Sequence, residues 1–171
     1  MKHIEIERKW LLDAFPSCIP LIREERVEQG YLTFDPVTVR IRKTEELAPN
    51  AGRTRHVLTI KGGGTLKRTE VEPRLAADEY EALLSLLPMP VVRKHFRLYQ
   101  LPDGHQLECS LVDEGEPTSF LYAEVEFDTE EQALAFQPPA FLGRELTGDG
   151  SWTMAAYCRR KYADANKKEC L

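Results

Sequence analysis

Several short segments of this chain alternate between apolar and polar positions, which is the pattern of a half-buried β-strand. The alternation is clearest in residues 4–10, 39–42, 58–61, 68–72 and 123–127. Successive side chains of a strand point to opposite faces, so each segment has one apolar and one polar face. The polar positions are nearly all charged, whereas an ordinary solvent face also carries Ser, Thr, Gln and Asn.

The first segment places Glu5, Glu7 and Lys9 on one face, and its apolar residues and Arg8 on the other. Two carboxylates about 7 Å apart along a strand, followed by an ammonium group, suit a hard metal ion that carries a phosphate. A solvated strand face is the alternative for this segment taken alone. The recurrence of the pattern in four further segments favours a common charged surface.

Periodicity does not say which face of these strands points inward. The ordinary arrangement buries the apolar face in a core and leaves the charges in water. The other arrangement closes about eight strands into a barrel, which encloses space for one small ligand. A lumen with carboxylates on some walls and Arg and Lys on others would bind a polyanion together with its metal ions.

Three helices are predicted beside the strands, at residues 77–87, 129–136 and 151–164. The first carries apolar residues at helical spacing and ends at Pro88, and the second opens on the N-cap Thr129. Residues 45–53 read as a hairpin connection. We therefore expect an α+β fold, with one domain over residues 1–164 and a polar tail over residues 165–171.

Composition narrows the class of protein. The chain has 171 residues, enough for one domain with a sizeable core, and its net charge of −5 argues against a nucleic-acid-binding protein. It has no apolar run long enough to cross a membrane and no signal-peptide pattern. Its four cysteines form no metal-binding or redox motif, so we expect reduced thiols and a cytoplasmic location.

Eight segments together resemble the triphosphate tunnel metalloenzymes, also called the CYTH superfamily. The resemblance covers residues 3–157, and the bacterial inorganic triphosphatases are most similar. In chain order the segments are Glu5-x-Glu7-x-Lys9, Gln29-Gly30-Tyr31-Leu32, Val39-Arg40-Ile41-Arg42, Leu58-Thr59-Ile60-Lys61-Gly62, Arg68-x-Glu70-x-Glu72, Leu101-Pro102-Asp103-Gly104, Ala123-Glu124-Val125-Glu126-Phe127 and Leu142-Gly143-Arg144-Glu145-Leu146-Thr147.

This resemblance implies a barrel with a charged tunnel that hydrolyses a phosphoanhydride bond of inorganic triphosphate, or of a related triphosphate, by attack of water. It implies Mg²⁺ or Mn²⁺ as the cofactor and a small-molecule triphosphate as the partner, with no nucleic acid and no membrane. Whether the chain forms a homodimer is left open by the sequence. The implied metal ligands are Glu5, Glu7, Glu124 and Glu126. The implied substrate-binding residues are Lys9, Arg40, Arg42, Lys61, Arg68 and Lys94. Catalytic roles fall to Lys9, Glu124 and Glu126, with Glu70, Glu72 and Glu108 as supporting acidic groups.

The chain departs from the family pattern at a few positions. The family has a Lys-x-Arg pair where this chain has Lys94 and Phe96, and Arg97 then points inward only if a bulge turns it. An acidic ligand of the family is replaced by Ser110, which puts a second metal ion in doubt. Trp152 and Met154 stand where the family often has Tyr and Asn.

These departures keep two other readings open. A degenerate tunnel would bind polyphosphate or a nucleotide without turnover. A class IV-type adenylate cyclase would use the ribose hydroxyl in place of water, and would need an adenine pocket that the sequence does not reveal.

Overall fold

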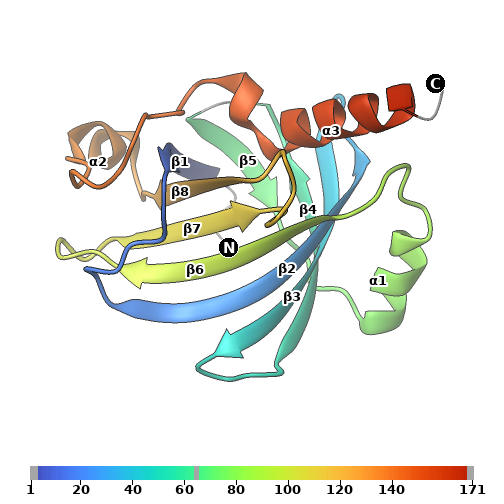
Figure 1. Cartoon of the computed structure of the whole chain (residues 1–171), viewed down its shortest axis with the longest axis horizontal. Helices are drawn as coiled ribbons and strands as arrows, with labels where there is room; N and C mark the ends of the chain where they lie inside the picture. The colour runs from blue at the N-terminus through green and yellow to red at the C-terminus, as the bar shows by residue number, and fades with distance from the viewer. Residues whose placement is uncertain (1–3, 64–65, 169–171) are drawn as a thin grey trace.

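In the computed structural model, which describes residues 4–63 and 66–168, eight antiparallel strands form a barrel (Figure 1). The strands are β1 (Ile4–Leu12), β2 (Leu21–Thr33), β3 (Thr38–Ala48), β4 (Thr54–Lys61), β5 (Lys67–Val71), β6 (Val92–Gln100), β7 (Gln106–Val112) and β8 (Phe120–Glu126). Their order is β1-β5-β4-β3-β2-β6-β7-β8, and β8 pairs with β1 to close the barrel. The predicted α+β fold with a closed antiparallel barrel is confirmed.

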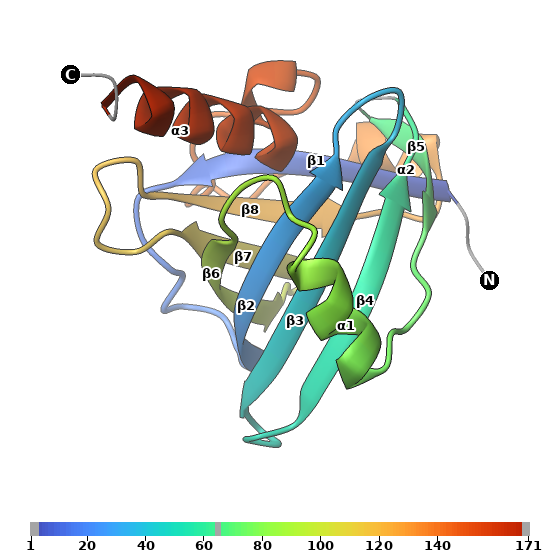
Figure 2. The same ribbon diagram turned by 90° about the vertical axis from the view of Figure 1, so that its right-hand side faces the viewer.

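The apolar faces of the strands point outward, and other parts of the chain cover much of them, although Ile4, Ile60 and Val71 stay exposed. One buried cluster lies on the outer face of β1, β7 and β8, where α2 (Glu130–Ala135) and the segment after it cover Ile6, Trp10 and Val125. The short helix α1 (Ala77–Leu84) packs on β3 and β4 from outside (Figure 2). The core therefore surrounds the barrel, and the lumen is left to the charged faces.

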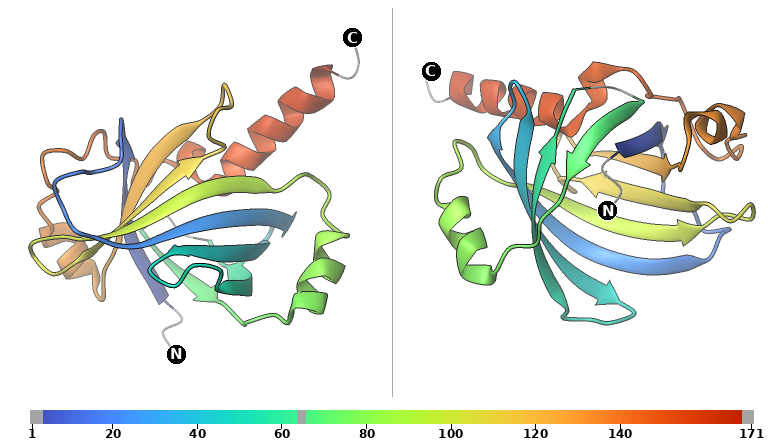
Figure 3. Two further views of the ribbon diagram at one scale, coloured as in Figure 1. Left: turned by 60° about the horizontal axis from the view of Figure 1, so that its bottom comes forward. Right: turned by 180° about the vertical axis from the view of Figure 1, so that it is seen from behind.

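A second buried cluster closes one end of the barrel. The 3₁₀ helix η1 (Gly150–Trp152) leads into α3 (Met154–Lys168), which crosses that end (Figure 3). Met154 packs there with Tyr31, Val112 and Tyr122. The opposite end, where β2 and β4 begin and β3 ends, forms the open mouth.

The barrel closes weakly between β1 and β5, whose pairing runs only from Ile4 to Ile6 on β1. Residues 143–147 lie beside the rest of β1, where Gly143 donates a backbone hydrogen bond to Leu11 (3.0 Å) and Leu146 donates one to Lys9 (2.8 Å). A Cβ at Gly143 would lie 2.6 Å from the Leu11 carbonyl oxygen, so only glycine fits this approach. The segment holds β1 against the tunnel.

Several predicted boundaries were wrong. Strand β3 continues to Ala48 and β4 begins at Thr54, so the connection covers 49–53 and not 45–53, because Glu45 still pairs with Thr54. Helix α1 ends at Leu84, three residues before the predicted end. Helix α3 begins at Met154 and continues to Lys168, four residues beyond the predicted end. Thr129 caps α2 as predicted, accepting a hydrogen bond from the Gln132 backbone.

Candidate active site in the barrel

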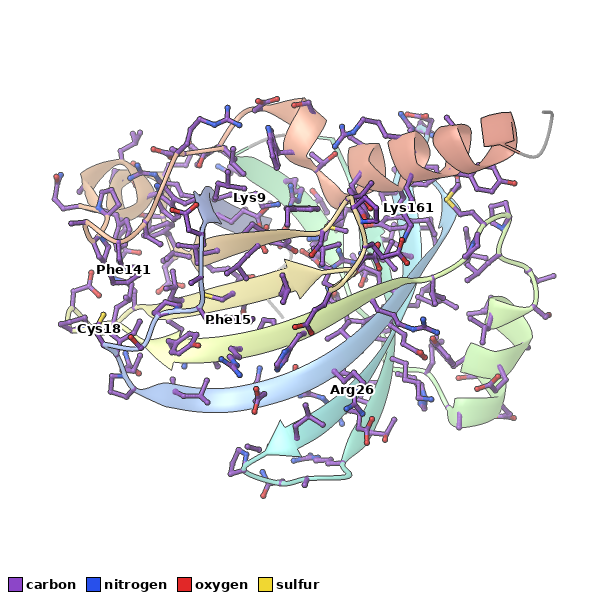
Figure 4. All side chains as sticks on the ribbon, in the orientation of Figure 1. Lys9, Phe15, Cys18, Arg26, Phe141 and Lys161 are labelled. Atoms are coloured by element: carbon purple, nitrogen blue, oxygen red, sulfur yellow. The ribbon has the colours of Figure 1, made fainter. Side chains whose placement is uncertain are left out.

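The barrel encloses a tunnel of about 790 Å³ that is rich in charged side chains of both signs. Every charged residue that the sequence assigned to the site lines this tunnel. These residues are Glu5, Glu7, Lys9, Arg40, Arg42, Lys61, Arg68, Glu70, Glu72, Lys94, Glu108, Glu124 and Glu126. Figure 4 shows the side chains on the ribbon, with Lys9 marking the inward face of β1.

Strand β1 is held in place from its outer side by Arg8. The guanidinium makes two hydrogen bonds of 2.8 Å to the Glu145 carboxylate and donates to the carbonyls of Ala133 and Phe136, both at 2.9 Å. It also lies over the Trp10 ring, 5.1 Å from its centroid. Four of the five N–H donors of this guanidinium are thus hydrogen-bonded, and the side chain ties β1 to α2 and to residues 143–147.

One wall of the tunnel is a network of ion pairs around Glu5. Its carboxylate lies 2.9 Å from Lys61 Nζ and 2.6 Å from Arg68 Nε, and Arg68 also reaches Glu7 at 2.6 Å. Lys61 completes the network with Glu70 at 3.0 Å. Burial opposes ionisation of Glu5, but the attraction of Lys61 and Arg68 prevails and holds its pKa well below the usual range.

The centre of the tunnel is basic. Arg40, Arg42 and Lys94 lie close enough that burial, together with the two guanidinium charges, lowers the pKa of Lys94 well below its usual value. Lys94 Nζ donates a 2.7 Å hydrogen bond to the Tyr122 hydroxyl. Within residues 4–63 and 66–163, no carboxylate lies within 4 Å of the charged nitrogens of Arg42 or Lys94, and the buried Arg42 Nε has no hydrogen-bond partner.

Arg40 is neutralised only loosely. Its Nη2 lies 3.7 Å from both Glu70 and Glu72, which is beyond normal hydrogen-bond length. Glu72 itself accepts a 2.6 Å hydrogen bond from Thr59. The basic centre therefore has more positive charge than its own surroundings balance, which suits a multiply charged anion.

Across the tunnel, acidic side chains meet on β1, β7 and β8. The strand register sets Glu7 opposite Glu126, and Glu108 opposite Glu124. Burial and the charges of Glu124 and Glu5 raise the pKa of Glu7 to about 7. Burial and the charges of Glu126 and Glu124 raise the pKa of Glu108 to about 8. Lys9 borders this group, with its Nζ 2.7 Å from Glu124.

This acidic group has the chemistry of a divalent-cation site. Carboxylate oxygens are the ligands that Mg²⁺ and Mn²⁺ prefer, and a cation would relieve the mutual repulsion of Glu7, Glu108 and Glu124. In the part of the chain that the structure describes, no three acidic, His or Cys side chains yet converge at metal-ligand distance. These carboxylates would have to turn toward one another to hold an ion, and retained waters would complete its shell, as is usual for Mg²⁺.

The departures from the family pattern occupy defined places. Phe96 and Ser110 face the tunnel, whereas Arg97 points outward, 2.8 Å from Glu24 and with its guanidinium 4.4 Å from the Phe15 ring centroid. The pairing of β6 with β7 is regular through these positions, so no bulge turns Arg97 inward. The tunnel consequently lacks the second cation of the Lys-x-Arg pair. Trp152 and Met154 line the closed end.

The sequence patterns did not predict a charged group at the open mouth. Arg23, Glu25 and Arg55 all line the tunnel there, with the Glu25 carboxylate between the two guanidiniums. The signal was weak because residues 23–26 are charged on both faces of β2, so no apolar and polar alternation marks the inward side. Tyr122 was also missed, since it lies among apolar residues in the sequence.

Comparisons with known proteins agree with this geometry. No model of a known protein family matches the chain. An inorganic triphosphatase of Nitrosomonas europaea is 33% identical over 149 residues, covering 85% of this chain and 90% of that protein. An inorganic triphosphatase of Acetivibrio thermocellus is 31% identical over 165 residues, covering 92% of this chain and 95% of that protein. The crystal structure of an inorganic triphosphatase superposes with a TM-score of 0.60 at 30% identity, covering 90% of this chain and 93% of that chain. Among the described helices, none is long and apolar enough to cross a bilayer.

Proposed function

This chain belongs to the triphosphate tunnel metalloenzyme (CYTH) family, in its inorganic triphosphatase branch, and from that premise we propose that it hydrolyses a phosphoanhydride bond of inorganic triphosphate with a divalent metal ion. The observation that carries the proposal is the basic centre of the tunnel. Arg42 and Lys94 point into it without a close carboxylate among the described residues, while Arg40 is only loosely paired. Triphosphate supplies the missing negative charge.

The residues of the basic centre would act mainly by positioning the phosphate chain. The guanidiniums of Arg40 and Arg42 present planar forks that match phosphate oxygens. Burial and the charges of Arg42 and Arg40 lower the pKa of Lys94. A bound polyanion reverses that field and favours the ammonium form. Substrate binding and protonation of Lys94 are therefore coupled.

We propose that Glu5, Glu7, Glu124 and Glu126 hold Mg²⁺ or Mn²⁺, with Glu108 close by. The bound ion would neutralise phosphate oxygens and polarise a water molecule. Glu5 enters this role only by exchanging its ion pairs with Lys61 and Arg68 for the metal. These two cations would then be released toward the substrate.

Lys9 joins the basic and acidic parts of the tunnel. Its Nζ lies 2.7 Å from Glu124 and 4.5 Å from the Tyr122 ring centroid. We propose that it binds the phosphate group under attack, while Glu124 and Glu126 orient the attacking water. No side chain needs to form a covalent intermediate, because water is the nucleophile.

The free thiols support the cytoplasm as the working compartment. Cys109 and Cys158 are buried and unpaired, and Cys18 is exposed and unpaired. Reduced cysteines are usual where glutathione and thioredoxin maintain thiols.

The decisive experiment is phosphate release from tripolyphosphate with Mg²⁺ or Mn²⁺. We expect turnover that disappears in Arg42→Ala. Calorimetric binding of tripolyphosphate without phosphate release would instead identify a non-hydrolytic tunnel. Conversion of ATP to cyclic AMP in preference to release of phosphate from tripolyphosphate would identify a cyclase.

A further inference from the structure

The open mouth of the tunnel carries a buried carboxylate between two guanidiniums. Glu25 is only 4% exposed. Arg23 Nε lies 2.8 Å from Glu25 Oε1, and Arg55 Nη2 donates a short hydrogen bond to the same oxygen. Both arginines keep about a third of their side-chain surface in solvent, at 32% and 38%. The group therefore stands where the tunnel meets water.

The mouth follows directly on the basic centre along the strands. Val57 lies opposite Arg42, and Val27 lies opposite both Lys94 and Thr44. All three of these uncharged residues line the tunnel. Glu25 and Arg55 are the next inward-facing residues of their strands, two positions or about 7 Å further out. A phosphate chain that extends outward from the centre would reach them next.

Space alone does not limit the length of that chain. A tunnel of about 790 Å³ falls within the range of pockets that hold drug-sized ligands. A limit on the length of the bound polyphosphate must therefore come from the charged groups that a longer polyphosphate would meet. Without Glu25, the two arginines would extend the basic surface outward to the mouth.

We propose that Glu25 determines chain length in this tunnel, by neutralising Arg23 and Arg55 so that triphosphate is accepted and longer linear polyphosphates are disfavoured. This inference rests on the proposed function, because it concerns the length of the same substrate. A fourth phosphate at the mouth meets a buried carboxylate of like charge. It gains the arginines only by breaking their pairs, which leaves Glu25 buried and uncompensated.

Arg23 is held so that it can change partners. Its buried Nε lies within ion-pair distance of Glu25 but has no hydrogen bond in the described structure. The guanidinium also lies over the Phe96 ring, 5.8 Å from its centroid. Removal of the Glu25 charge would free a guanidinium that is already placed at the mouth.

The test compares linear tripolyphosphate with linear tetrapolyphosphate in steady-state kinetics. We expect the wild type to prefer tripolyphosphate at least about tenfold in kcat/KM, a difference of about 1.4 kcal/mol. Glu25→Gln should reduce that preference about tenfold, chiefly through a lower KM for tetrapolyphosphate. Arg55→Ala should increase the preference for tripolyphosphate, because the Glu25 carboxylate then has one cation fewer beside it. The matched control is Glu45→Gln, since Glu45 forms an exposed ion pair with Arg26 on the same two-stranded segment.

The outcomes separate this inference from the function on which it rests. A wild type that does not hydrolyse tripolyphosphate contradicts the proposed function. A wild type that hydrolyses both substrates equally well overturns the role of Glu25 while leaving the function intact, and needs no variant. If the preference for tripolyphosphate is unchanged in both Glu25→Gln and Arg55→Ala, the role of Glu25 is likewise overturned and the proposed function stands. Should Glu25→Gln fail to fold, Arg55→Ala alone decides, because its guanidinium is partly in solvent.

Discussion

Phe96 and Ser110 lie directly opposite each other on β6 and β7, and both face the tunnel. These are the two positions at which the family pattern would place an arginine and an acidic residue. Residues paired in this way have Cβ atoms about 5 Å apart, so the two charges would attract each other. Their joint replacement therefore removes a pair, and neither change leaves an isolated charge in the wall.

This relationship predicts that the two positions act together. Ser110→Asp alone places a carboxylate opposite a phenyl ring, where burial would favour its neutral form. We expect Ser110→Asp with Phe96→Arg to raise kcat more than the sum of the single changes, with a coupling of about 0.5–3 kcal/mol. Steady-state kinetics of a double-mutant cycle at saturating metal measures this. Additive effects would show that the two positions are independent.

Arg42 should contribute strongly to binding of the phosphate chain. Its Nε is buried, its side chain lines the tunnel, and no carboxylate lies within 4 Å of its charged nitrogens in the described part of the chain. Arg42→Ala should cost about 1.5–3 kcal/mol of binding, the range for a hydrogen bond to a charged group. Calorimetry with tripolyphosphate measures the change. The control is Arg26→Ala, because Arg26 (labelled in Figure 4) pairs with Glu45 at the surface. Equal affinities of the two variants would remove Arg42 from the site.

The metal prediction concerns the acidic group. Activity should vanish with a chelator and return with Mg²⁺ or Mn²⁺, and the ion should raise the melting temperature of the wild type without substrate. Glu126→Gln and Glu5→Gln should each weaken that stabilisation, whereas Glu45→Gln should not. Thermal melts over a range of metal concentrations measure it. Full metal response and full hydrolysis in both Gln variants would show that the ion binds elsewhere.

Much of the fold was readable because the charge pattern and the strand period coincide. Glu5, Arg40 and Lys61 alternate with apolar neighbours, so their strands and shared faces followed directly. The choice between a charged exterior and a charged lumen did not follow from periodicity. It needed the family resemblance, and the pairing of β8 with β1 then confirmed the closed barrel.

The parts that could not be predicted depend on contacts between distant strands. Glu25 gives no local signal, because its importance comes from Arg23 beside it and from Arg55 thirty positions away. Likewise, the coupling of Phe96 to Ser110 exists only through the register of β6 and β7. The direction of Arg97 depended on whether β6 carries a bulge, which sequence alone did not decide.

The acidic group should also make stability depend on pH in a way that Glu108 reveals. Its pKa is raised to about 8 by burial and by Glu126 and Glu124, so the folded chain keeps a proton that the unfolded chain releases near pH 4.5. Between these values the folded state binds more protons, and stability falls as pH rises. The pKa of Lys94 is lowered, which gives a slope of the opposite sign in the range where only the unfolded chain keeps that proton.

The informative quantity is therefore the difference in free energy of unfolding between wild type and Glu108→Gln, from which the Lys94 contribution largely cancels. In metal-free denaturant unfolding, Glu108→Gln should gain stability relative to wild type from about pH 5 to pH 8 and level off above. Saturating Mg²⁺ should reduce this gain, because a bound cation favours the ionised carboxylate. A difference that stays constant over this pH range, or falls, would mean that Glu108 is already ionised in the folded protein.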